Sequence, residues 1–463
     1  MANDVAAIVL AAGKGTRFRS DLAKVLHRAA GRSLIGHVLE AVRPLQLAQV
    51  IVVVGHQADE VRAEVEASGI PGLTTVVQSE QRGTGHAVQQ AVPALAHGID
   101  RVMVLAGDTP MITTSWLERL MADANDVGGA LLTAQLTDPS GYGRVLRDRD
   151  GHVEGIVEHK DASPAQLMVR EINAGMYLVD RGRLVGALAQ LDDDNEQGEI
   201  YLTDVVRILT SEDLPFAGTE APAEVIAGVN DRIQLAEAAA ILRRGHLLHL
   251  MAETGVGVLD PATTYVDVDV EVGRDTVLLP GTILERGTRV GERSTIGPNS
   301  HLTNVEVGDD AVVHSTRGVD AVIGDAAEVG PFAHLRAGTR LGAATKVGAY
   351  VETKNTTLGE RSKIPHLSYV GDAEVGTGVN IACGVITVNF DGTTKSQTTI
   401  EDDAFIGCDT MLVAPVTIGA RAYTAAGSTI TDDVPADALG IARSHQTTKE
   451  GWVARRQERD RRG

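Results

Sequence analysis

The chain has 463 residues, which is enough for two or three domains with sizeable buried cores. Its formal net charge of −20 argues against nucleic acid or a membrane surface as a main partner, because an acidic surface repels phosphates. No stretch approaches the roughly 18 apolar residues of a membrane span, and no signal-peptide pattern opens the chain. The two cysteines, Cys383 and Cys408, are too few for a disulfide framework, so we expect a cytoplasmic protein.

Short apolar runs alternate with helical patterns through residues 1–230. The apolar runs are Val5–Leu10, Val50–Val54, Thr74–Val77 and Val102–Leu105, and the helical patterns lie around Leu34–Val42, Asp59–Ala67 and Gly85–Leu95. Strands separated in this way by helices predict a Rossmann-like α/β domain, with a mostly parallel sheet and helices on both faces. Ligands of such sheets bind beyond the carboxyl ends of the strands.

One long helical pattern, residues 231–252, follows this region. Asp231 is its expected N-cap, and its apolar stripe comprises Ile233, Leu235, Ala239, Leu242, Leu247 and Leu250. We therefore expect a first domain over 1–230, a linking helix over 231–252, a second domain over 253–445 and a tail over 446–463. Its last residues, Ala454–Gly463, are rich in Arg, and we expect a solvated or disordered end.

Apolar residues recur every six positions from Val272 onward. The runs are Val272, Leu278, Leu284, Val290, Ile296 and Leu302; Ile323, Val329, Leu335, Leu341 and Val347; Leu358, Ile364 and Val370; Val375 and Ile381; and Ile400, Ile406, Leu412 and Ile418, with Thr424 interrupting before Ile430. Glycine often follows the apolar residue, and the chain holds 50 glycines, above the roughly 7% of ordinary proteins. The period predicts a triangular β-helix whose aliphatic side chains stack from turn to turn. Asn389–Thr399 breaks the period and predicts a loop that leaves the coil, a common place for ligand contacts.

A glycine-rich loop, Leu10-Ala-Ala-Gly-Lys-Gly-Thr-Arg17, follows the first apolar run directly. Small residues let backbone N–H groups approach phosphates, Arg17 offers a bidentate clamp, and Lys24 adds positive charge. The loop matches neither the Walker pattern nor the dinucleotide fingerprint. Taken alone, it also fits a simple strand-to-helix turn.

Further motifs accompany the loop. They are Gln78-x-x-x-x-Gly83-Thr84, Leu105-Ala-Gly-Asp108, Gly141-Tyr-Gly-Arg144, Glu158-His-Lys160, Glu171-Ile-Asn-Ala-Gly175 and Gly228-Val-Asn230. Together they resemble the sugar-1-phosphate nucleotidyltransferases, and specifically the bifunctional N-acetylglucosamine-1-phosphate uridylyltransferase/glucosamine-1-phosphate acetyltransferase family. The resemblance spans the entire chain, and it implies that the β-helix is left-handed.

The resemblance implies roles for the matched residues of the first domain. Uracil and its nucleotide would be held by Leu10, Ala11, Ala12, Gly13, Gln78, Gly83 and Thr84; phosphates by the catalytic Arg17 and Lys24; the sugar phosphate by Gly143, Glu158 and Asn173; and Mg²⁺ by Asp108 and Asn230. Mg²⁺ prefers few protein oxygens plus substrate oxygens, which suits one Asp and one Asn. The sugar phosphate would attack the α-phosphate of UTP in line, and pyrophosphate would leave.

Three of these residues also allow plainer interpretations. Asp108 follows a strand end and a glycine and could serve a turn. Asn230 could cap the linking helix. Glu158 and Lys160 could form a surface ion pair.

The resemblance also places a second active site on the β-helix, within the motifs LRAGT, VETKN, HLSYVGDAEVG, NI-x-x-G and NFDGTTK. His366 would be the general base that deprotonates the amine of glucosamine 1-phosphate for attack on acetyl-CoA, since an imidazole titrates near working pH. The other matched polar positions are Arg336 and Lys354 for the sugar phosphate, Tyr369 and Asn380 for the sugar or acetyl group, Asn389 and Lys395 beside them, and Ala426 and Arg443 for coenzyme A.

Phe390 and Cys408 depart from the family pattern, which commonly has Tyr and Ser at these places, and Cys383 replaces a small residue. Phe390 lacks a hydroxyl that could bind substrate, which puts the efficiency of acetyl transfer in doubt. We hypothesise that both thiols lie near the acetyl-CoA sulfur. Small apolar fillers of the coil are an equally good interpretation.

The leading interpretation is a bifunctional enzyme that acetylates glucosamine 1-phosphate and then couples the product to UTP, giving UDP-N-acetylglucosamine for cell-wall precursors. The resemblance implies a homotrimer whose acetyl sites lie between neighbouring chains. One alternative is a single-function nucleotidyltransferase with a β-helix for assembly, as in ADP-glucose and GDP-mannose pyrophosphorylases. Another is a non-catalytic scaffold, against which the intact glycine loop, Asp108 and Asn230 argue.

Overall fold

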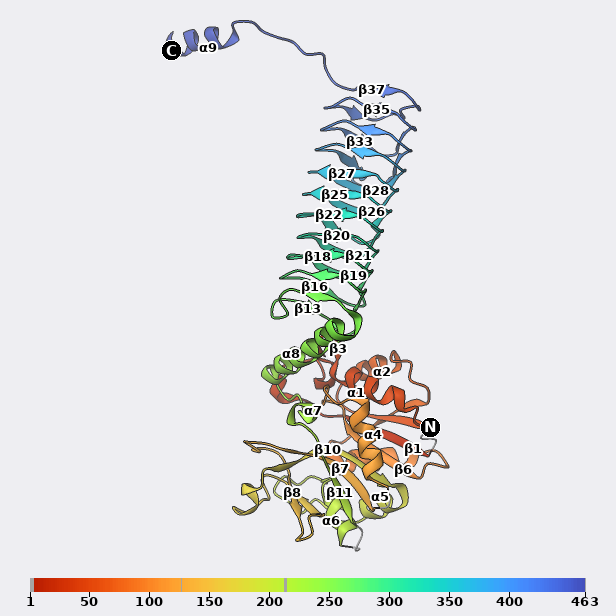
Figure 1. Cartoon of the computed structure of the whole chain (residues 1–463), viewed down its shortest axis with the longest axis vertical. Coiled ribbons are helices and arrows are strands. Elements are labelled where there is room, and N and C mark those ends of the chain that lie inside the picture. Colours follow the sequence, from red (N-terminus) through yellow and green to blue (C-terminus); the bar gives the residue numbers. More distant parts are fainter. Residues whose placement is uncertain (1–3, 126, 212–214, 463) are drawn as a thin grey trace. The chain divides into compact units, whose positions relative to one another are not determined.

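A computed structural model describes residues 4–125, 127–211 and 215–462 (Figure 1). The chain divides into two compact units, 1–245 and 246–463. The division falls inside one helix, α8 (Arg232–His249). Within the described ranges, no helix combines the length and the apolar character needed to cross a bilayer.

A mixed sheet forms the centre of the first unit, in the order β11-β7-β10-β6-β1-β4-β5, with β8 and β9 attached at β10. Its strands are β1 (Val5–Ala11), β4 (Gln49–Val54), β5 (Leu73–Val77), β6 (Arg101–Ala106), β7 (Gly129–Gln135), β8 (Arg144–Arg147), β9 (Val153–Val157), β10 (Glu171–Asp180) and β11 (Phe216–Glu220), beside a small hairpin of β2 (Arg28–Ala29) and β3 (Arg32–Ser33). β1 is parallel to β4 and β6, as predicted, while β10 runs antiparallel to β6 and β7.

Helices cover both faces of this sheet (Figure 1). They are α1 (Leu34–Val42), α2 (Ala58–Glu66), α3 (Thr84–Ala91), α4 (Thr114–Asp123), α5 (Arg181–Leu188), α6 (Asp204–Thr210) and α7 (Ala223–Ile226), with 3₁₀ turns at Thr16–Phe18, Lys24–Leu26, Arg43–Leu45, Val92–Ala94 and Gln166–Met168. Val5, Ala7 and Val9 of β1 pack with α1, α2 and α4, whereas Ala6 and Ile8 pack with α3 and α5. Burial on both faces explains why β1 is apolar at every position.

α8 begins as predicted at Asp231, whose Oδ1 accepts hydrogen bonds from the Ile233 and Gln234 amides at 2.9 Å each. The prediction that Ile233 belongs to the apolar stripe is wrong, because its side chain is 72% exposed. The buried face runs through Leu235 and Ala238, and Ile233 lies about 200° around the helix from Leu235. After His249 the helix ends in a π-helical turn, Leu250–Thr254.

The second unit is a coil of short parallel strands in two ladders (Figure 1). One ladder holds β12 (Gly257–Val258), β15 (Val277–Leu278), β18 (Thr295–Ile296), β20 (Val312–Val313), β22 (Glu328–Val329), β25 (Lys346–Ala349), β27 (Lys363–His366), β29 (Asn380–Ile381), β32 (Phe405–Ile406), β35 (Tyr423–Thr424) and β37 (Leu439–Gly440). The other holds β13 (Tyr265–Val266), β14 (Glu271–Val272), β16 (Ile283–Glu285), β17 (Arg289–Val290), β19 (His301–Val307), β21 (Arg317–Ile323), β23 (His334–Leu335), β24 (Arg340–Leu341), β26 (Glu352–Leu358), β28 (Tyr369–Val375), β30 (Ile386–Val388), β31 (Thr398–Ile400), β33 (Met411–Val413), β34 (Val416–Ile418) and β36 (Thr429–Ile430). Each strand pairs with the equivalent strand of the next turn of the coil, as in a β-helix.

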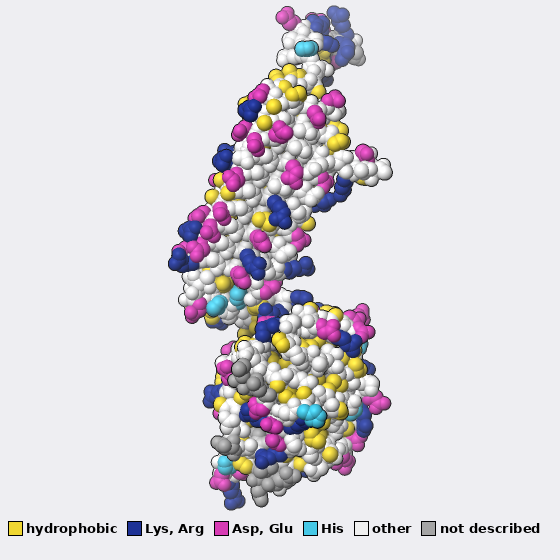
Figure 2. All heavy atoms as spheres, turned by 90° about the vertical axis from the view of Figure 1, so that its right-hand side faces the viewer, with side chains coloured by type: hydrophobic (Ala, Val, Ile, Leu, Met, Phe, Trp, Pro, Cys, Tyr) yellow, Lys and Arg dark blue, Asp and Glu magenta, His cyan; other side chains and the backbone are white. Residues whose placement is uncertain are grey.

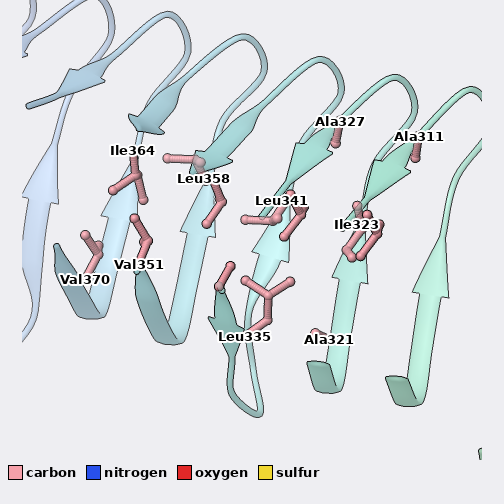
Figure 3. Packing of buried hydrophobic residues seen from close by; sticks show 14 of the residues in the cluster. Ala311, Ala321, Ile323, Ala327, Leu335, Leu341, Val351, Leu358, Ile364 and Val370 are labelled. Carbon is pink, nitrogen blue, oxygen red and sulfur yellow. The ribbon is translucent and has the colours of Figure 1, made fainter. Parts of the chain in front are cut away.

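The six-residue period marks the inside of this coil. Every residue of the predicted apolar runs, Thr424 included, is at most 4% exposed. Figure 3 shows Leu335, Leu341, Leu358 and Ile364 pointing into the coil and stacking from turn to turn. Because each fully buried aliphatic side chain contributes roughly 1.5–3 kcal/mol, this repetitive core stabilises the coil.

Residues 389–397 leave the coil between β30 and β31, where the sequence predicts a loop. The register then resumes, with Asn380 beside Phe405. The tail carries one helix, α9 (Trp452–Arg462), whose described side chains are all exposed.

Candidate active sites

A cavity of about 410 Å³ opens at the carboxyl ends of β1 and β6 in the first unit. Eleven of the residues predicted to bind nucleotide, sugar or metal line it: Leu10, Ala11, Ala12, Gly13, Lys24, Gln78, Gly83, Thr84, Asp108, Glu158 and Asn173. Arg17, Gly143 and Asn230 do not line it themselves. Asn230 contacts the lining residue Lys24, Gly143 adjoins the lining residue Glu158, and Arg17 contacts Asn230.

Oxygen and nitrogen groups converge at one side of the cavity. The Lys24 ammonium contacts Asp108 Oδ2 and lies 2.8 Å from Asn230 Oδ1, to which Arg17 also donates at 3.0 Å. The Asp108 carboxylate therefore faces the site rather than a turn. Asn230 does not cap α8, because Asp231 takes that place.

The cavity wall also carries a half-buried carboxylate, that of Glu158. Glu158 Oε1 accepts a hydrogen bond from Thr203 Oγ1 at 3.1 Å, and burial raises the pKa of Glu158 above its ordinary value. Among the described residues Glu158 forms no ion pair with Lys160, whose ammonium instead donates to Gln197 at 3.1 Å. The interpretation as a surface ion pair is therefore wrong. A Cβ added to Gly143 would lie 3.4 Å from Glu158 Oε1, which places Gly143 against the same carboxylate.

A bulge in β10 presents Asn173 to the cavity. The register with β7 shifts between Asn173 and Tyr177, around Gly175 at φ +71°. Asn173 Nδ2 donates to the Tyr177 hydroxyl at 2.6 Å, and its Oδ1 accepts from the Gly175 amide at 3.0 Å. Such bulges commonly re-aim a side chain beside an active site.

The segment before α6 also reaches the cavity, and sequence reasoning missed it. Glu199, Leu202 and Thr203 line the wall, and the Leu202 amide donates to Thr84 Oγ1 at 3.1 Å. A Cβ on Gly83 would lie only 2.5 Å from the Ile200 carbonyl oxygen. No periodic pattern marks this segment, so only the folded chain reveals its proximity.

In the second unit, His366 ends β27 with an exposed side chain. The registers that pair Lys363 with Asn380, and Asn380 with Phe405, place His366, Cys383 and Cys408 at equivalent positions of successive turns. The Asp409 amide donates to the Cys383 carbonyl at 2.8 Å, which keeps that register through both cysteines. Both thiols are free, Cys383 half-buried and Cys408 exposed.

Cationic side chains gather on the neighbouring turns. The Lys395 ammonium on the loop approaches Lys354, and this proximity lowers the pKa of Lys354. Arg336 is held by Glu352, with Nη1 2.8 Å from the carboxylate. Two ammonium groups at close range favour an anion between them. Elsewhere the charges are mixed: on the face of the coil visible in Figure 2, acidic and basic side chains are interspersed.

Asn389 and Tyr369 meet at a corner of the coil. Asn389 Nδ2 contacts the Asp372 carboxylate and lies 3.5 Å from the Tyr369 hydroxyl, and Asn355 donates to the same carboxylate at 2.7 Å. Asp372 was not predicted; its left-handed φ of +50° marks it as a corner residue. The loop then pairs Phe390 with Lys395, and the Phe390 ring is 54% exposed.

The remaining predicted residues lie further along the coil. Asn380 is half-buried at the start of β29. Ala426 follows Cys408 by one turn, as the hydrogen bond from the Gly427 amide to the Cys408 carbonyl shows, at 2.8 Å. Arg443 is exposed beyond β37, and no contact among the described residues joins it to the others.

Within the described part of the chain, no cluster of three or more His, Cys, Asp or Glu side chains is arranged to hold a metal ion. Asp108 and Asn230 nevertheless offer two oxygen atoms to one cationic group, the Lys24 ammonium. This donor set fits Mg²⁺, which uses one or two protein oxygens together with substrate phosphates.

Residues 7–207 match the family model of the MobA-like NTP transferase domain. Residues 397–432 match the bacterial transferase hexapeptide (six repeats), and residues 287–315 match the hexapeptide repeat of succinyl-transferase. The chain is similar to three curated proteins called "Bifunctional protein GlmU", each 49% identical to it. The relative from Exiguobacterium sibiricum aligns over 96% of this chain and 99% of its own length, that from Mycolicibacterium vanbaalenii over 98% and 93%, and that from Streptomyces avermitilis over 97% and 94%.

Proposed function

The chain belongs to the family of bifunctional GlmU proteins, and from this membership we propose how its two units make UDP-N-acetylglucosamine. The second unit transfers an acetyl group from acetyl-CoA to glucosamine 1-phosphate. The first unit then transfers a uridylyl group from UTP to the N-acetylglucosamine 1-phosphate so formed. The observation that best supports this function is the convergence of Lys24, Asp108 and Asn230 at the cavity of the first unit.

The first unit acts by positioning and by offsetting charge. Gln78, Gly83 and the Leu10–Gly13 loop hold the nucleotide, while Glu158 and Asn173 hold the sugar. A phosphate oxygen of the sugar phosphate forms a bond to the α-phosphorus of UTP, and the bond to the bridging oxygen of pyrophosphate breaks. Arg17 and Lys24 neutralise the charge that accumulates on the leaving phosphates.

Asp108 and Asn230 would hold Mg²⁺, because their side-chain oxygens converge on a single cationic position. When bound, the ion supplies charge neutralisation between phosphate groups. The Lys24 ammonium, which occupies that position here, is then free to turn toward the phosphates.

In the second unit His366 takes a proton from the amine of glucosamine 1-phosphate. The amine nitrogen then forms a bond to the acetyl carbon, and the carbon–sulfur bond to coenzyme A breaks. Arg336, Lys354 and Lys395 hold the sugar phosphate, supported by the close approach of the two lysines. Tyr369, Asn380 and Asn389 orient the sugar or acetyl group, and Cys383, Phe390, Cys408, Ala426 and Arg443 would meet the acetyl-CoA. From the family resemblance we also infer a cytoplasmic homotrimer.

One experiment tests both activities. Purified protein is supplied with glucosamine 1-phosphate, acetyl-CoA, UTP and Mg²⁺, and coenzyme A thiol and pyrophosphate are followed separately. Asp108→Ala should abolish pyrophosphate release and leave thiol release intact. His366→Ala should abolish thiol release, but it should still release pyrophosphate when N-acetylglucosamine 1-phosphate is supplied. His314→Ala, which removes a histidine of the same ladder bonded to the Gly297 carbonyl, serves as the control. Pyrophosphate without thiol would indicate a nucleotidyltransferase alone, and neither product would indicate a scaffold.

A further inference from the structure

Gln78 is a polar side chain of the nucleotide cavity whose carboxamide nitrogen is held by two protein acceptors. It is 3% exposed, and its backbone is anchored by a 2.8 Å hydrogen bond from its amide to the Val54 carbonyl. Its Nε2 donates to the Gly83 carbonyl at 3.2 Å and approaches His86 Nδ1 at 3.0 Å. Both hydrogens of the carboxamide nitrogen are therefore used by the protein.

These two acceptors fix which end of the Gln78 carboxamide faces the protein. The Gly83 carbonyl oxygen can only accept, and Gly83 is itself confined by its φ of +109° and its closeness to Ile200. The nitrogen of Gln78 must therefore face this carbonyl. No donor among the described residues reaches Gln78 Oε1, so this oxygen is the group that Gln78 has left for a ligand.

His86 lies outside the cavity, half-buried on the first turn of α3. To accept from Gln78, its Nδ1 must be unprotonated, which puts the proton of the neutral ring on Nε2. Gln90 Nε2, one turn further along the helix, lies 3.2 Å from His86 Nε2, so two nitrogen atoms face each other. Rotation of this amide by 180° presents its oxygen to the Nε2 proton, since amide ends are interchangeable.

We propose that His86 is a positioning residue of the nucleotide site, which fixes the Gln78 carboxamide so that it offers an oxygen acceptor and no donor to the base. An acceptor at this place matches a pyrimidine ring that carries an N3–H group, as uracil and thymine do. It repels the N3 lone pair of cytosine. The inference rests on the proposed uridylyl transfer and assigns part of its base specificity to a residue that does not touch the nucleotide.

The test compares UTP with CTP as substrates for pyrophosphate release by the full-length protein. In His86→Leu the second N–H of Gln78 loses its acceptor. Only the hydrogen bond to the Gly83 carbonyl still opposes rotation of the amide, so its nitrogen turns toward the base more readily. We expect kcat/KM for UTP to fall about tenfold, mainly through KM, and the preference for UTP over CTP to fall by a similar factor, because a buried hydrogen-bonding group is left unpaired. Tenfold corresponds to about 1.4 kcal/mol.

Two variants distinguish a loss of Gln78 positioning from a non-specific loss of activity. His86→Asn can place its Oδ1 where Nδ1 stands, two bonds beyond Cβ, and should restore most of the UTP preference. Gln89→Leu removes a hydrogen bond from the same helix to the Leu188 carbonyl, away from His86, and should leave the preference unchanged. Equal loss of UTP and CTP turnover in His86→Leu, or no restoration by His86→Asn, would overturn the inference.

A second measurement does not depend on how His86→Leu folds. Nitrogen NMR of ¹⁵N-histidine-labelled protein, with His86 assigned through His86→Asn, should show a neutral ring protonated at Nε2 and accepting at Nδ1. A ring protonated at Nδ1 would refute the proposed contact. If wild-type protein released no pyrophosphate from UTP, the proposed function would fail; if wild-type turnover is normal and the variants match it, only the role of His86 fails.

Discussion

Lys24 Nζ lies 2.8 Å from the side-chain oxygen of Asn230, although 206 positions separate the two residues. The same ammonium contacts Asp108, so one cation joins the glycine-rich loop region, the end of β6 and the segment that leads into α8. This contact holds three groups where we propose that the phosphates of a nucleotide bind.

Replacement of Lys24 by Met should therefore reduce pyrophosphate release by about 10²–10³-fold, since a preorganised charge at the leaving phosphates is lost. Release of coenzyme A thiol should stay unchanged. Arg28→Met is the control, because Arg28 pairs on the surface with Glu64 and the Gly31 carbonyl. Steady-state pyrophosphate assays give the comparison, and an equal fall in thiol release would contradict it.

The half-buried carboxyl of Glu158, which we propose to hold the sugar, predicts a pH dependence of sugar binding. Burial raises its pKa, so the carboxylate that accepts from a sugar hydroxyl is lost at a higher pH than for an exposed glutamate. KM for N-acetylglucosamine 1-phosphate should rise as pH falls through this pKa, and Glu158→Gln should remove that dependence. Glu154→Gln, on the exposed side of β9, should retain it.

The raised pKa of Glu158 also predicts an effect of Glu158→Gln on the stability of the folded protein. A group whose pKa is raised on folding stabilises the folded state below its unfolded pKa, and this contribution is lost as pH rises through the folded pKa. The neutral variant should therefore melt at a higher temperature than the wild type at pH 8, with a smaller difference at pH 4. Thermal unfolding at the two pH values decides this, and a larger difference at pH 4 would contradict the assignment.

Lys354 and Lys395 predict an anion site in the second unit. Their closeness lowers the pKa of Lys354, so a phosphate between them relieves a repulsion that the unliganded protein carries. Lys395→Met should raise KM for glucosamine 1-phosphate about tenfold at low salt and less at 1 M salt, with kcat nearly unchanged. Lys363→Met, an exposed lysine of β27, should have no such effect.

Substitution of Gly83 tests its close approach to the backbone of Ile200, in the segment before α6. An alanine there would combine an unfavourable φ of +109° with a Cβ 2.5 Å from the Ile200 carbonyl, so uridylyl transfer should fall at least tenfold. Gly98→Ala carries a similar φ of +85° but meets nothing within 4 Å. It should cost about 1 kcal/mol of stability and leave turnover intact, as melting curves and pyrophosphate assays can show.

The two free cysteines predict a pattern of thiol modification. Cys408 is exposed and Cys383 half-buried, so an alkylating reagent should label Cys408 faster. If both thiols lie beside the acetyl-CoA sulfur, saturating acetyl-CoA should slow the labelling of each several-fold, as peptide mass spectrometry would show. Equal labelling with and without acetyl-CoA would contradict this placement of the thiols.

The period of six could predict the interior of the coil because successive faces of the coil contribute one inward-pointing residue each, six positions apart. Each step of six brings the chain to the same place on the next face, so Leu341 and Val347 follow Leu335 into the core without any long-range information. The strands and helices of the first unit were likewise predictable up to β6, since buried strands and amphipathic helices differ in local pattern.

Contacts between distant loops could not be predicted in this way. The Thr203–Glu158 hydrogen bond joins residues 45 positions apart and depends on where irregular segments lie in space, so no spacing in the sequence encodes it. Asp372 was missed for a similar reason: its partners Asn355 and Asn389 lie on the turns before and after it. Motif resemblance identified single residues, whereas the network that holds them requires coordinates.

The loop at residues 389–397 lengthens one turn of the coil, so that Asn380 pairs with Phe405, 25 positions later, while Lys363 pairs with Asn380, 17 positions later. The ladder is otherwise undisturbed, because the extra residues leave at a corner and never enter the stack. A corner of this kind can therefore accept an insertion or deletion of residues without altering the strand register of the following turns. Evolution can remodel the reach and chemistry of such a loop while the rest of the β-helix stays the same.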